Sequence, residues 1–127
     1  MMRTILSLLL VSTNALSLNI PIELRLRWIE ITEPYHSMCI CATGVDQTKA
    51  INFLAKLELP EDPCVKCFAK CLMISLGMMS SDGVIIPEAV AAPLEIAQKC
   101  SNETLDVLDA CEKSYAFGKC LFPLLII

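Results

Sequence analysis

The sequence predicts an all-α fold in which disulfides join short helices. Helix start and stop signals recur along the chain, and no Asn-Gly pair or similar hairpin signal marks a turn between two strands. Eight cysteines in 127 residues indicate a disulfide framework formed in an oxidising compartment. A hydrophobic content of 55%, with only 19% charged residues, indicates a chain that encloses something apolar or enters a membrane.

The N-terminal segment has the composition of a secretory signal peptide. A positive charge precedes an apolar run over residues 5–11, and small residues then offer cleavage sites after Ala15 or Ser17. We therefore assign residues 1–17 to a signal peptide and residues 18–127 to one mature, secreted domain. A buried N-terminal helix is the alternative, and the segment lacks the amphipathic face which that helix would need.

Composition disfavours several other functions. The net charge of -4 argues against nucleic acid and anionic membrane surfaces as partners. Outside the N-terminus no apolar run is long enough to span a bilayer, so we expect no membrane span. The single histidine, His36, leaves no histidine-centred catalytic triad, so we expect no enzyme, no catalytic residues and no cofactor. We interpret His36 as a solvated surface group rather than as a pH switch.

Prolines and a glycine divide the first part of the chain. Pro21 opens a segment that we interpret as a helix, although Leu24 and Leu26 begin an alternation that a strand would also show. Pro34 should break or kink this helix, and Gly44 should end the segment that follows it.

Two aspartates mark the next helix starts. Asp46 is a good N-cap, and Asp62 followed by Pro63 is a strong helix start. The helix that begins there should end near Gly77, and it carries three of the cysteines: Cys64, Cys67 and Cys71.

Helix signals continue to the C-terminus. Pro87 opens a stretch that is interrupted at Pro93 and continues towards Cys100. We expect Ser101 or Asn102 to cap a last long helix that reaches about Leu121, followed by an apolar tail over residues 122–127. Residues 102–104 also form a glycosylation sequon, and capping is the interpretation that we favour.

The spacing of the cysteines favours bridges between elements over local ones. Cys67 and Cys71 are four residues apart on one helix face, so they must reach different neighbours. Cys111 and Cys120 are nine apart and emerge on nearly opposite sides of a helix.

Six cysteines and the residues around them resemble the insect odorant-binding protein family. Three residues separate the second and third cysteines and eight separate the fifth and sixth, in the series Cys39, Cys67, Cys71, Cys100, Cys111 and Cys120. Three further segments fit the family as well: Thr43-Gly-Val45, Lys66-Cys-Phe-Ala-Lys-Cys71 and Asp82-Gly-Val84. The resemblance covers nearly the whole mature chain.

The resemblance implies a compact array of about six short helices around an apolar cavity, interlaced by three to four disulfides. The implied pairs are Cys39–Cys71, Cys67–Cys111 and Cys100–Cys120. One departure is that the segment between Cys71 and Cys100 is shorter than is common in the family.

Cys41 and Cys64 are additional to this pattern, and we expect them to form a fourth bridge, Cys41–Cys64. The competing arrangement is Cys39–Cys64 with Cys41–Cys71. Two free or intermolecular thiols, or a zinc site built from Cys39, Cys41, Cys64 and Cys67, are further alternatives. With a signal peptide present we favour the bridge and expect no metal.

The resemblance also implies a lipophile inside the helices, and helical spacing suggests which side chains line its cavity. The expected lining residues are Phe68, Leu72, Leu76, Met79, Leu108, Tyr115 and Phe122. The Tyr115 hydroxyl is a candidate anchor for an alcohol, aldehyde or ester, or else a group reaching solvent at the rim. The tail over residues 122–127 is a candidate wall or lid.

These expectations amount to a secreted carrier of small hydrophobic molecules such as odorants or pheromones. Besides the ligand, an olfactory receptor and a second copy of the chain are candidate partners. The alternatives are a saposin-like or other secreted helical lipid binder, and a disulfide-rich interaction protein with a filled core.

Overall fold

The computed structural model describes residues 21–125, and the fold over these residues is all-α. The predicted signal peptide, residues 1–17, lies outside the described residues and stays a prediction. The helices are α2 (Ile22–Thr32), η1 (Glu33–Tyr35), α3 (His36–Thr43), α4 (Gln47–Ala55), α5 (Pro63–Ser75), η2 (Pro87–Ala89), α6 (Leu94–Glu103) and α7 (Ala110–Leu125).

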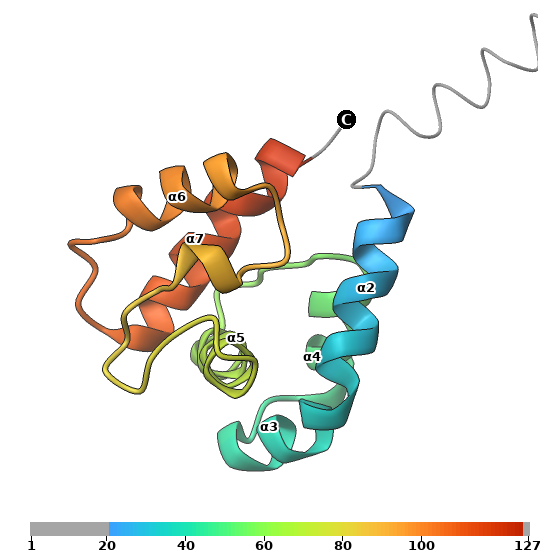
Figure 1. The fold of residues 1–127 in the computed structure, drawn as a ribbon. Helices are drawn as coiled ribbons and strands as arrows, with labels where there is room; N and C mark the ends of the chain where they lie inside the picture. Colours follow the sequence, from blue (N-terminus) through green and yellow to red (C-terminus); the bar gives the residue numbers. More distant parts are fainter. Residues whose placement is uncertain (1–20, 126–127) are drawn as a thin grey trace, which may run out of the picture.

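Helix α5 is the central element of the fold (Figure 1). It packs most extensively against α7 on one side and next against α3 on the other. Helix α2 packs on α4, and α6 packs on α7. This arrangement confirms the compact helical array that the resemblance implied.

The predicted helix boundaries of the first half are confirmed. Helix α2 ends at Thr32, and Pro34 lies in the short helix η1 that follows it. Gly44 follows α3 with a left-handed φ of 68°, which suits glycine. The Asp46 carboxylate accepts from the Lys49 amide, and the Asp62 carboxylate accepts from the Cys64 amide. These caps fix where α4 and α5 begin.

The predicted start of the last helix is wrong. Helix α6 continues through Ser101 and Asn102 to Glu103, because its buried face extends to Cys100 and Ser101. A loop follows, and the Asp109 carboxylate accepts from the Glu112 amide at 2.9 Å, so that α7 begins at Ala110. Asn102 therefore caps no helix.

The predicted tail continues α7, which runs to Leu125 and includes Pro123. The segment after Pro87 forms only the short helix η2. Nowhere in residues 21–125 is a helix both long enough and apolar enough to cross a bilayer.

Three disulfides tie the helices together, and they are the three pairs that the resemblance implied. Cys39–Cys71 joins α3 to α5, Cys67–Cys111 joins α5 to α7, and Cys100–Cys120 joins α6 to α7. Helix α5 is therefore covalently linked to a neighbour on each side.

The expected fourth bridge, Cys41–Cys64, is not formed, and both residues carry free thiols. Cys39 points into the core towards α5 and is fully buried. A residue two positions further along a helix points about 200° away. Cys41 therefore faces solvent, away from α5 and from Cys64. The same bridge from Cys39 to Cys71 rules out the competing arrangement and removes Cys39 from any zinc site.

Candidate ligand-binding cavity

An apolar cavity of about 90 Å³ lies between α2 and α4 on one side and α5 and α7 on the other. It is smaller than the roughly 150 Å³ apolar cavity that accepts benzene in another protein. None of the side chains lining it is ionisable. In this conformation the cavity suits a small apolar guest, and a larger one requires wall side chains to move.

Helices α5 and α7 build one wall with the same helical spacing. Each contributes a series at positions i, i+3, i+4 and i+7, which share one face of a helix. The two series are Ala69, Leu72, Met73 and Leu76 on α5, and Ser114, Phe117, Gly118 and Leu121 on α7.

The opposite wall comes from α2, from α4 and from Leu57, two positions after the end of α4. Its lining side chains are Trp28, Ile31, Thr32, Phe53, Leu54 and Leu57. Trp28 makes two contacts across the cavity. The centroid of its ring lies 5.6 Å from that of Phe122, and its indole nitrogen donates to the Ala91 carbonyl at 2.7 Å. Trp28 therefore holds α2 against α7 and against the segment before α6.

Two hydroxyl groups are the polar side-chain groups of the wall besides this indole. The Thr32 hydroxyl donates to the Trp28 carbonyl at 2.7 Å, and the Ser114 hydroxyl donates to the Ala110 carbonyl at 2.8 Å. The Thr32 oxygen also lies 3.0 Å from Nε2 of His36. Burial lowers the pKa of His36, and the nearby Glu33 carboxylate partly offsets this.

Three of the predicted lining residues, Leu72, Leu76 and Phe122, do line the cavity. Phe68 and Met79 are buried in the core behind the wall and do not line it. Phe122 also packs against both hydrophobic clusters of the core, so the start of the predicted tail is a wall element within α7.

Leu108 is not a lining residue, and its prediction is wrong. Its side chain is 93% exposed, because the loop before α7 carries it where a longer helix was expected.

Tyr115 is likewise not the polar anchor of the cavity. One residue further along α7 than Ser114, it is rotated by about 100° and faces the start of α5. Its hydroxyl donates to the Leu59 carbonyl at 2.7 Å, and its ring lies 4.8 Å from the Lys66 ammonium. Burial, ahead of the nearby Glu61 carboxylate, raises the pKa of Tyr115.

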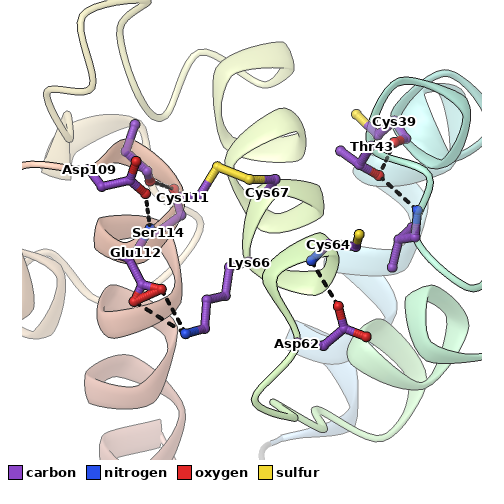
Figure 2. Close-up of a disulfide and its surroundings, with 12 residues drawn as sticks. Cys39, Thr43, Asp62, Cys64, Lys66, Cys67, Asp109, Cys111, Glu112 and Ser114 are labelled. Carbon is purple, nitrogen blue, oxygen red and sulfur yellow. Dashed lines mark hydrogen bonds and ion pairs between the residues drawn. A yellow bond between two sulfur atoms is a disulfide. The ribbon is translucent and has the colours of Figure 1, made fainter.

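Lys66 connects α5 to α7 beside this tyrosine, next to the Cys67–Cys111 bridge (Figure 2). Its ammonium lies 2.7 Å from the Glu112 carboxylate and 2.9 Å from that of Glu61. The hydrogen bonds to Glu112 and then Glu61 raise the pKa of Lys66. The cluster stabilises the contact between the two helices and lies outside the cavity wall.

Sequence reasoning missed most of the wall. The spacing of Ser114, Phe117, Gly118 and Leu121 was a visible signal for a buried face of α7. Trp28 carried no such signal, because the alternation around it left its helix face undefined.

A disulfide-linked helical array around an apolar cavity is the architecture of odorant-binding proteins. The solved structure "Odorant-binding protein dmelOBP28a from Drosophila melanogaster" has this fold, with a TM-score of 0.59 and 19% identity over 76% of this chain and 91% of that chain. A search of curated protein sequences finds no match. The PBP/GOBP family matches residues 25–123, so this chain belongs to the PBP/GOBP family.

Proposed function

We propose that this protein is a secreted carrier that holds a small hydrophobic molecule in its cavity and keeps it dissolved in extracellular fluid. The observation that carries the proposal is the cavity itself, which is bordered by apolar side chains and by no ionisable one. Such a cavity stays dry and favours an apolar guest.

Two further observations support secretion and family function. The three disulfides need an oxidising compartment in order to form and persist. The structurally similar Drosophila melanogaster protein is named an odorant-binding protein. An odorant or pheromone is the corresponding cargo, and delivery to an olfactory receptor or pairing with a second copy would be later steps of the same role.

Reversible uptake of a small lipophile tests the proposal. Cyclohexane should enter as wall side chains move apart, because it is larger than the cavity in this conformation. Titrated into the delipidated protein, it should bind at one site per chain and change the emission of Trp28, the only tryptophan. Native mass spectrometry should show a complex that disappears on organic extraction. A protein with a filled core would show neither effect, and that result would reject the carrier function.

A matched pair of variants locates the site. Leu76→Trp places a larger side chain in the wall, and Leu108→Trp makes the same change at the exposed loop. We expect the first variant to bind cyclohexane at least about tenfold more weakly, because it fills the cavity, and the second to bind as the wild type does. Equal affinities would place binding elsewhere.

A second pair tests the predicted tail as a wall. Phe122→Ala removes a lining ring, whereas Leu124→Ala truncates an exposed side chain two residues further along α7. Isothermal titration with cyclohexane should show a changed affinity for the first variant only, because only that variant alters the cavity. Unchanged affinity in both would retire the idea that this segment closes the cavity.

A further inference from the structure

The polar side chains of the cavity wall can still accept hydrogen bonds, but their hydrogens are already in use. The wall contains three polar side-chain hydrogens, on Trp28, Thr32 and Ser114, and each is already donated to a backbone carbonyl: those of Ala91, Trp28 and Ala110. A hydroxyl oxygen that donates its proton still has lone pairs with which it can accept. The wall side chains therefore retain acceptors but no spare donor.

We infer that the cavity discriminates between ligands that can donate a hydrogen bond and ligands that can only accept one. It selects hydrocarbons and alcohols over aldehydes, ketones, esters and carboxylates of the same size. The inference rests on the proposed function and names the chemical class of its cargo. It replaces the expectation that the Tyr115 hydroxyl would anchor any of these groups, since that hydroxyl donates to Leu59 outside the cavity.

The physical reason is a count of hydrogen bonds. A ligand carbonyl leaves water and meets a wall whose polar hydrogens are in use. If it recruits the Ser114 proton, the bond to the Ala110 carbonyl is broken, so one bond is lost in either case. An alcohol can donate to the oxygen of Ser114 while the bond to Ala110 remains. It can also donate to the lone pair of the Thr32 oxygen that the contact with Nε2 of His36 leaves free. A hydrocarbon has no polar group to satisfy.

An ionised carboxylate is disfavoured most. No cationic side chain borders the cavity, so a buried carboxylate would lack a charge partner. The Lys66 ammonium is already paired with Glu61 and Glu112 at the contact between α5 and α7, outside the cavity wall.

Three six-carbon rings of similar size test the inference by isothermal titration: cyclohexane, cyclohexanol and cyclohexanone. We expect the wild type to bind cyclohexane and cyclohexanol well. It should bind cyclohexanone about tenfold more weakly than cyclohexanol, because the ketone loses one hydrogen bond. Equal affinity for the two oxygenates, or tighter binding of the ketone, would overturn the inference and leave the carrier function standing. Binding of none of the three would reject both.

Variants of the two hydroxyls supply an independent check. Thr32→Val and Ser114→Ala, singly and together, remove the acceptors that an alcohol needs. They should lower the affinity for cyclohexanol more than that for cyclohexanone, so that the ratio of the two falls towards one. If the ketone loses affinity instead, the hydroxyls donate to ligands and the inference is wrong. Retained cyclohexane binding reports that each variant is folded.

Discussion

Leu57, in the cavity wall, has a backbone conformation that leucine rarely adopts. Its φ is 57°, at the turn where the chain leaves α4, and this left-handed region normally favours glycine. The conformation costs a non-glycine residue about 1–2 kcal/mol. The side chain offsets that cost by covering the cavity and packing against the core.

Substitutions at Leu57 should therefore reverse the usual order of alanine and glycine. Leu57→Gly loses the packing but relieves the backbone, whereas Leu57→Ala loses the packing and keeps the strain. We expect the free energy of unfolding in urea to be about 1 kcal/mol lower for the alanine variant than for the glycine variant. An alanine variant that is the more stable of the two would show that the turn is not strained.

His36 is a titratable group in contact with the cavity wall, through Thr32. Because its pKa is lowered in the folded state, the unfolded chain binds the proton more tightly. This residue's contribution to stability is therefore complete above the ordinary imidazole pKa of about 6.5 and declines as the pH falls towards the lower folded value.

The variant His36→Gln isolates this effect. The wild type should lose melting temperature on going from pH 7.5 to pH 5, and the glutamine variant should lose less, because it has no proton to take up at that position. Thermal unfolding followed by circular dichroism measures both. Parallel pH profiles for the two proteins would assign the acid sensitivity to carboxylates instead.

At the scale of elements, α2 is a wall of the cavity that no disulfide holds in place. It precedes Cys39, the first cysteine of the chain, so no disulfide reaches it. It packs mainly on α4, where the Arg25 guanidinium donates to the Ala55 carbonyl. The Trp28 side chain is its hydrogen-bonded link to the far side of the cavity, and Leu24 also packs against the core there. Helix α5, by contrast, is bridged on both sides.

Amide hydrogen exchange should reflect this difference. We expect the amides of α2 to exchange about tenfold or more faster than those of α5, because α2 opens without global unfolding. Bound cyclohexane should slow the exchange of α2. Trp28→Phe keeps a ring but deletes the donor to Ala91, and should accelerate exchange in α2 alone. Equal protection of the two helices would contradict the local opening.

At the scale of the whole molecule, the disulfides replace part of the close packing that a domain of this size would otherwise need. They close loops with sequence separations of 32, 44 and 20 residues. Loop-closure entropy gives each about 3–4 kcal/mol of stability. An unfilled cavity lowers stability, and the stability that the disulfides add offsets this cost for the apolar cavity beside α5.

The free thiols provide a direct check on this framework. Native protein treated with a thiol reagent should label at two cysteines per chain, Cys41 quickly and the half-buried Cys64 more slowly. Cys41→Ser should remove the fast phase, and peptide mapping without reduction should recover the three bridges. A native protein with no reactive thiol would falsify the present pairing and restore the Cys41–Cys64 bridge.

The predictable part of the fold depended on local signals. Asp46 and Asp62 satisfy nearby helix amides, and Gly44 adopts a left-handed turn, so these boundaries were readable from neighbours alone. The start of α7 was not. Ser101 and Asp109 are both acceptable caps by type, and packing of the face around Cys100 decided between them.

The sequence by itself determined the helical class, most helix boundaries and, through its family resemblance, the three disulfide pairs. Only the tertiary structure decided which apolar residues border the cavity, because residues such as Phe68 and Leu72 share one helix yet face core and void respectively. It also decided that Tyr115 serves the α5–α7 contact and that Cys41 faces solvent. The reason is geometric: periodicity places a side chain on a face of its own helix, whereas what that face meets depends on how distant helices are rotated against it.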